Sequence, residues 1–169
     1  MSTWRVALLE QARSDFRAAD ALALRGGHES QTTMLLQMAW EKLAKAALVA
    51  SGTWDPQKRS HKVITKFASV LKKASRIGDV LHLPTALGVR SRLTWLQGEL
   101  EALEALTPKI ADGRENAEYP WEARDAAGEL TIRWPAEHLT RRFSDAKERG
   151  GVHLRKDFGV IEQNFDRLF

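Results

Sequence analysis

The sequence contains no cysteine, which excludes disulfide bonds, thiolate zinc sites and catalysis by a cysteine nucleophile. No stretch is long and apolar enough to span a bilayer. The first residues, MSTWRVALLEQAR, carry Arg5 and Glu10 inside their apolar pattern, so they predict a folded amphipathic helix and not a signal peptide. We therefore expect a cytoplasmic protein.

Common motifs of enzyme sites are missing as well. The histidines and carboxylates show no H-x3-H or HExxH spacing, so the sequence predicts no metal site. No glycine-rich phosphate loop follows a strand, and there is no Gly-x-Ser-x-Gly element. We expect no cofactor.

Acidic residues are fewer than basic ones, 22 against 26, which gives a net charge of +4. The basic surplus gathers in two stretches. The first holds Lys58, Arg59, Lys62, Lys66, Lys72, Lys73 and Arg76, and the second holds Arg141, Arg142, Lys147, Arg149, Arg155 and Lys156. A basic face attracts phosphate backbones, which favours nucleic acid as a partner, and solubility is the alternative interpretation.

Apolar residues recur at steps of three and four along four segments, 3–25, 34–52, 60–78 and 85–107. This spacing predicts four amphipathic helices, and their short joins predict an antiparallel bundle. Ser60 is expected to cap the third helix. A chain of 169 residues fits a single domain, with residues 3–107 as its core bundle.

The helical pattern stops at residues 108–135, which are richer in proline, glycine, aspartate and asparagine. LTIRW alternates polar and β-branched or aromatic residues, and EYPW can pair with it, so we expect a small β-hairpin insertion. Residues 136–169 predict two C-terminal helices, with Pro135 opening the first and Gly150-Gly151 ending it. The stripe of the second is Leu154, Phe158, Ile161, Phe165 and Leu168.

The stretch QMAWEKLAKAALVASG resembles the second helix of HEPN domains, which are small helical bundles with the pattern QxAxEKxxKAxLxxxG in that helix. The matching residues are Gln37, Ala39, Glu41, Lys42, Lys45, Ala46, Leu48 and Gly52. LLEQARSDFRAADAL is similar to the first helix of the family. RSHKVITKF stands where HEPN domains paired with nucleotidyltransferases have THDL, with His61 matching and Lys62 replacing the acid. EYPW resembles the RYP of the family without its arginine, and the resemblance covers residues 4–120.

The resemblance implies an all-α, HEPN-like four-helix bundle that binds RNA or nucleotides. It also implies a homodimer whose helices flank a basic cleft. The protein would act together with a nucleotidyltransferase or another component of a bacterial toxin–antitoxin or defence system. Glu41, Lys42 and Lys45 would then lie at the edge of the dimer seam. A simpler interpretation is that Glu41 and Lys45, one turn apart, form an ordinary surface pair.

Catalytic HEPN proteins cut RNA without a metal, through an Arg-x4–6-His motif from each protomer. A histidine can move a proton at the ribose hydroxyl or the leaving oxygen, while an arginine holds the phosphate. Two pairs have this spacing here, Arg76 with His82 and Arg133 with His138. Both lack the polar residue that often follows the motif arginine.

Candidate phosphate-binding residues lie around the start of the third helix: Lys58, Arg59, His61, Lys62 and Lys66. His61 could instead pack locally or cap the turn. His153 has Arg149 and Arg155 nearby but no acid partner in a recognisable pattern. Trp4, Trp40 and Trp95 fit helix faces, where they would belong to the core or to an interface. Trp54, Trp121 and Trp134 fall in loops, where they would stack on bases or cover an end of the bundle.

Three functions are therefore open. The leading one is an RNA- or nucleotide-binding module, the second is a metal-independent endoribonuclease toxin, and the third is a structural module whose basic face contacts an acidic protein.

Overall fold

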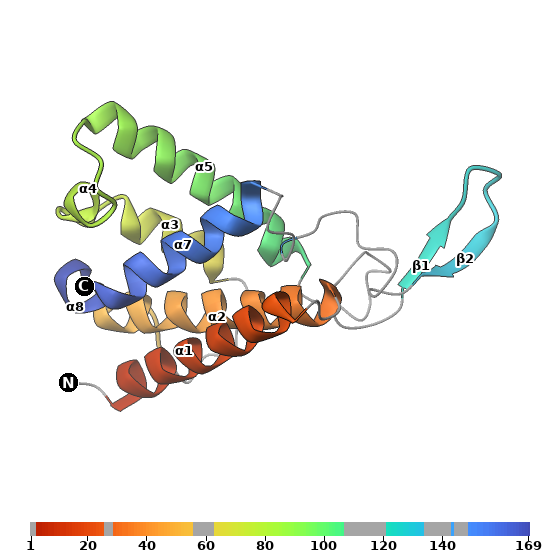
Figure 1. Ribbon diagram of the computed structural model, residues 1–169, viewed down its shortest axis with the longest axis horizontal. Coiled ribbons are helices and arrows are strands. Elements are labelled where there is room, and N and C mark those ends of the chain that lie inside the picture. Colours follow the sequence, from red (N-terminus) through yellow and green to blue (C-terminus); the bar gives the residue numbers. More distant parts are fainter. Residues whose placement is uncertain (1–2, 26–28, 56–62, 107–120, 134–142, 144–148) are drawn as a thin grey trace.

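The computed structural model describes residues 3–25, 29–55, 63–106, 121–133, 143 and 149–169. These residues are mostly helical, and the only sheet among them is a two-stranded hairpin (Figure 1). The all-α expectation is confirmed. No helix in the described ranges has the length and apolarity needed to cross a membrane.

Helices α1 (Thr3–Leu24) and α2 (Glu29–Ala50) lie side by side and run in opposite directions (Figure 1). Both were expected from their apolar stripes, but α2 begins at Glu29, before the segment 34–52 in which it was predicted. Ala12 and Ala19 of α1 are fully buried, as are Ala39 and Ala46 of α2. Small side chains at these positions let the two backbones approach closely along the pair.

The segment predicted as one helix over residues 60–78 is two helices, α3 (Ile64–Leu71) and α4 (Ile77–Val80). In an unbroken helix, Ile77 and Val80 would point roughly 100° or more away from the stripe that contains Ile64 and Leu71. The turn after Leu71 redirects the chain so that all four side chains are buried.

The first turn of α3 is capped from a distant part of the sequence. Glu104, in α5 (Ala86–Ala105), accepts hydrogen bonds from the Ile64 amide at 2.8 Å and from the Thr65 hydroxyl. Ser60, the expected cap, lies outside the described residues. The start of α5 is capped locally, because Thr85 Oγ1 accepts a hydrogen bond from the Gly88 amide at 3.1 Å.

The C-terminal helix α7 (Arg149–Gln163) forms part of the core and is followed by the short α8 (Phe165–Leu168). Phe158 stacks on Phe16 of α1 with ring centroids 4.3 Å apart, and it meets the edge of Trp40 of α2 at 5.2 Å. The bundle therefore buries α7 against α1 and α2.

The expected helix end at Gly150-Gly151 is wrong, because both glycines lie in the first turn of α7. A Cβ atom on Gly151 would lie 2.2 Å from the carbonyl oxygen of Phe143, which is itself buried. The glycine allows this close approach of two backbones and does not stop the helix. The rest of the helix predicted from Pro135 lies outside the described residues.

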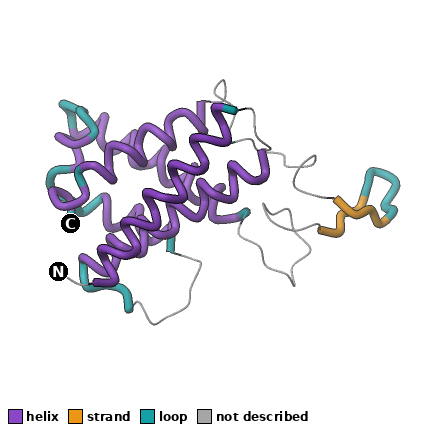
Figure 2. The backbone as a smooth tube through the Cα atoms, turned by 60° about the horizontal axis from the view of Figure 1, so that its bottom comes forward, coloured by secondary structure: helices purple, strands orange, loops and turns teal. Residues whose placement is uncertain are grey.

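A β-hairpin is present as predicted, with β1 (Trp121–Arg124) antiparallel to β2 (Leu130–Arg133), but β1 shares only Trp121 with EYPW, the strand predicted to pair with LTIRW. Its turn has a clear chemical basis. Asp125 Oδ1 accepts hydrogen bonds from the amides of Ala127 and Glu129, both at 2.9 Å, and Gly128 takes a positive φ of 83°. The hairpin stands away from the helices in both views (Figures 1 and 2).

Candidate functional site

Exposed basic side chains lie on α3, between α3 and α4, and near the start of α5. We call this set the α3–α5 basic surface: Lys66, Lys72, Lys73, Arg76 and Arg90. None of them forms an ion pair with another described residue, and Lys72 Nζ donates to the neutral Gln97 Oε1 at 2.6 Å. Residues 63–90 contain these five basic residues and one acid, Asp79, so the segment carries a charge equal to the +4 of the whole chain.

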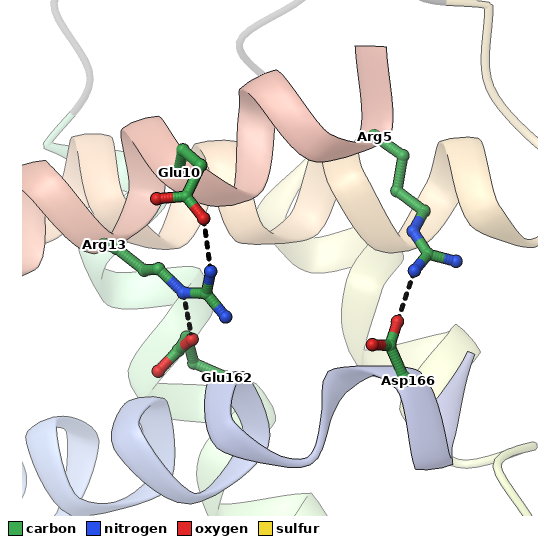
Figure 3. Close-up of polar contacts among 5 residues, drawn as sticks. All are labelled: Arg5, Glu10, Arg13, Glu162 and Asp166. Atoms are coloured by element: carbon green, nitrogen blue, oxygen red, sulfur yellow. Dashed lines mark hydrogen bonds and ion pairs between the residues drawn. The ribbon is translucent and has the colours of Figure 1, made fainter. Parts of the chain in front are cut away.

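Many basic side chains elsewhere are neutralised within the fold. Arg5 of α1 pairs with Asp166 of α8, and Arg13 bridges Glu10 and Glu162 (Figure 3). The hydrogen bond to Glu162 raises the pKa of Arg13 above its ordinary value. These pairs join α1 to α7 and α8. Because the charges are neutralised within the chain, these arginines attract an outside anion only weakly.

The charges inside the HEPN-like stretch also have partners within the chain. Lys42 Nζ lies 3.3 Å from Asp15 Oδ2 of α1. Glu41 is buried and pairs with Lys45, whose ammonium lies 5.6 Å from the centre of the Trp54 ring. The Glu41–Lys45 pair is thus more buried than an ordinary surface pair, and these residues help to join α1, α2 and the loop after α2.

The two predicted Arg–His pairs lie in separate parts of the chain. Arg76 immediately precedes α4 and His82 follows it, and both are exposed. His82 adopts a φ of 55°, and no hydrogen bond of its side chain to a described residue is present. Arg133 ends β2 opposite Trp121, at the other end of the molecule from α4 (Figure 1), and His138 lies outside the described residues.

Of the candidate phosphate-binding residues, only Lys66 is described, and it is exposed on α3. The other four, Lys58, Arg59, His61 and Lys62, lie outside the described residues. They directly precede the α3–α5 basic surface along the chain.

A second cluster joins α5 to α7, and we call it the Arg92 cluster: Arg92, Trp95, His153 and Asp157. Arg92 Nη2 donates to Asp157 Oδ1 at 2.7 Å and contacts His153 Nδ1 at 3.3 Å. The Arg92 guanidinium carbon lies 4.4 Å from the centre of the Trp95 ring, and the Trp95 and His153 rings are in a T-shaped arrangement with their centroids 5.5 Å apart. Arg92, Trp95 and His153 are half-buried, so the cluster reaches the surface.

Asp157 is the buried member of the Arg92 cluster. Desolvation raises the pKa of its carboxyl above the ordinary 3.8, and the hydrogen bond from Arg92 opposes this shift. Its Oδ2 atom is buried and has no hydrogen-bond partner among the described residues. The Asp157 carboxyl therefore forms a hydrogen bond with Arg92, but its burial costs solvation free energy.

The contact with Arg92 favours one tautomer of the His153 ring. A guanidinium only donates hydrogen bonds, so Nδ1 of the ring accepts and the proton of the neutral ring sits on Nε2. In this form Nε2 can donate a hydrogen bond to a phosphate oxygen, but it cannot take a proton from a hydroxyl. The arrangement suits anion binding better than base catalysis.

Sequence reasoning missed the Arg92 cluster because Arg92 and His153 are 61 residues apart. The one local signal is the i, i+4 spacing of His153 and Asp157, which places both on one face of a helix. Within the described residues, no three histidine or carboxylate side chains gather as a metal site would require.

Comparison with protein-family models, with curated proteins and with solved structures finds no match for this chain.

Proposed function

We propose that this chain is an HEPN-like module that binds RNA or nucleotides through the α3–α5 basic surface. In this proposal it works in the cytoplasm as a component of a bacterial toxin–antitoxin or defence system, together with a nucleotidyltransferase or similar partner. The family and the partner rest on the sequence resemblance. The binding surface rests on one structural observation, five exposed cations without an ion pair to any described residue.

The physical reason is electrostatic. Each lysine or arginine that neutralises a phosphate releases a condensed counterion, so exposed and unpaired cations favour polyanions strongly at low salt. Pairing with a carboxylate of the same chain would weaken this attraction. The basic surface keeps its charge available, whereas the cations of Figure 3 do not.

The Arg92 cluster adds polar and aromatic groups to this proposal, although Arg92 itself is paired with Asp157. Lys72, which directly follows α3, bonds to Gln97 of α5, and Arg92 of α5 bonds to α7, so a basic group lies at the contact of α5 with each of these neighbours. Trp95 is half-buried and holds the Arg92 guanidinium over its ring, and the Nε2–H group of His153 is a donor for phosphate.

The test of the proposal is retention of RNA over a series of salt concentrations. Binding that weakens steeply with salt, without cleavage, supports it. Indifference to both RNA and mononucleotides at low salt contradicts it.

The second candidate is a metal-independent endoribonuclease. The observation that favours it is the exposure of Arg76 and His82 on either side of α4, where both side chains are accessible to a substrate. In such a reaction the ribose 2′-oxygen attacks phosphorus and the bond to the 5′-oxygen breaks. One group accepts the 2′-hydroxyl proton and another gives a proton to the leaving oxygen.

A further inference from the structure

The β1–β2 hairpin carries its aliphatic residues on its exposed face. In the observed register Leu130 lies opposite Arg124, and Ile132 lies opposite Glu122, so the four side chains share one face. All four are exposed, Leu130 and Ile132 at 57% each. The described side chains of the opposite face are less exposed: Ala123, Thr131 and Arg133.

Apolar residues of a two-stranded ribbon normally face a layer that covers them. Both views show the hairpin standing away from the helices, so no described element of the chain covers Leu130 and Ile132 (Figures 1 and 2). An isolated two-stranded hairpin is marginally stable in water and gains from packing against a further layer.

The turn holds the hairpin in one shape before any partner arrives. Asp125 Oδ1 accepts two backbone hydrogen bonds, and the Asp125 amide donates to the Glu129 carbonyl at 3.0 Å. Gly128 supplies the left-handed residue that closes the loop. A preorganised surface loses less conformational entropy on association.

The charges of this face are self-complementary. Glu122 lies beside Ile132 and Arg124 lies beside Leu130, and the two charges are about 7 Å apart along the strand. A twofold axis that lies between the two faces and runs perpendicular to the strands would bring Glu122 to Arg124 of the partner subunit, twice, with the aliphatic side chains of the two β2 strands packed beside these pairs. Arg124 Nη1 donates to the Gly128 carbonyl at 2.7 Å, which leaves its other N–H groups for a carboxylate.

We propose that two copies of this chain associate through the hairpin faces formed by Glu122, Arg124, Leu130 and Ile132. The two aliphatic pairs pack against each other, and two reciprocal Glu122–Arg124 ion pairs fix the register. The face is small beside the roughly 800 Å² per partner of a standard interface, so the dimer dissociates on dilution. This association does not depend on the proposed function.

Sedimentation from low micromolar to near-millimolar protein tests the association. The wild type is expected to shift from monomer to dimer, whereas the double variant Leu130→Thr/Ile132→Thr stays monomeric. Threonine keeps the β-propensity of the strand, so the hairpin itself is retained. The matched control is Leu87→Gln, another exposed apolar residue, on α5, and it is expected to dimerise like the wild type.

Charge exchange tests the twofold register. Glu122→Arg alone opposes like charges at both ends of the face and is expected to weaken the dimer about 10-fold. The exchange Glu122→Arg/Arg124→Glu restores both pairs and is expected to return the affinity to within about 3-fold of the wild type. A partner other than a second copy does not predict this recovery.

Three results would overturn the proposal. They are a wild type that is monomeric at every concentration, a dimer unaffected by Leu130→Thr/Ile132→Thr, and a charge exchange that fails to recover affinity. The first is also the result expected if another segment of the same chain covers the face. RNA retention by the monomeric variant is measured in parallel, so a failure of the dimer is distinguished from a failure of RNA binding.

Discussion

Arg92 Nη2 lies 2.7 Å from Asp157 Oδ1, and this ion pair joins α5 to α7 at the edge of the core. The Asp157 side chain is almost fully buried, while the Arg92 side chain is partly exposed. A pair of this kind combines a large cost of desolvation with a strong mutual attraction. The desolvation cost and the mutual attraction of this pair can therefore be measured separately.

Removing the cation is expected to destabilise the fold strongly. Arg92→Leu leaves the buried carboxylate of Asp157 without its donor, at a cost of about 3 kcal/mol in the free energy of unfolding. The double variant Arg92→Leu/Asp157→Leu removes both charges and is expected to recover most of that loss. Urea denaturation measures both, and a double variant no more stable than Arg92→Leu would contradict this view of the pair.

Asp157→Asn is expected to change how stability depends on pH. Burial raises the pKa of Asp157 in the folded protein above the ordinary 3.8, so the folded chain holds this proton where the unfolded chain has released it. The resulting stabilisation is complete below about pH 3.8 and is lost as the pH rises through the raised pKa. We therefore expect the free energy of unfolding of the wild type, minus that of Asp157→Asn, to fall with rising pH.

Denaturation of both proteins at a series of pH values checks this sign. A difference that instead grew in favour of the wild type would mean that the attraction of Arg92 outweighs the burial of Asp157 and lowers the pKa of its carboxyl.

Two glycines of α7 are expected to respond in opposite directions to alanine. Gly151→Ala places a methyl group against the Phe143 carbonyl, so the fold must shift and lose stability. At Gly159 a Cβ atom meets nothing within 4 Å, and alanine there should stabilise the helix by about 0.4–1 kcal/mol. Thermal unfolding compares the two, and equal effects would contradict the close approach at Phe143.

RNA incubated with the protein and EDTA is expected to remain intact. The reason is that neither described histidine is arranged as a base: His153 accepts from Arg92 at Nδ1, and the His82 side chain has no hydrogen bond to a described residue that would orient its ring. Gel analysis of the RNA checks this. Cleavage that disappears in His82→Ala, or in His138→Ala, would favour the endoribonuclease.

The sequence predicts the long helices well because their information is local. The stripes of α1, α2 and α5 recur every three or four residues, and glycine or proline marks where each ends. The hairpin was also predictable, because LTIRW alternates and lies close to its partner strand in sequence.

The errors fall where a distant residue decides the local structure. Gly150-Gly151 resembles a helix stop until the Phe143 carbonyl is seen against Gly151. The cap of α3 comes from Glu104, forty residues away, and no local pattern predicts it. The Arg92 cluster has the same origin, because packing of α5 on α7 brings its members together.

The most direct test of the central claim is the salt dependence of RNA binding by a variant of the α3–α5 basic surface. The variant is Lys66→Gln/Lys73→Gln/Arg76→Gln, and its matched control is Arg17→Gln/Arg25→Gln/Lys156→Gln, three exposed cations outside that surface. For single-stranded RNA we expect the first variant to bind more weakly and to lower the slope of log K against log salt by about 2, since each lost phosphate contact removes about 0.7. The control should keep the wild-type slope. Equal slopes for the wild type and both variants would contradict the claim that this surface binds nucleic acid.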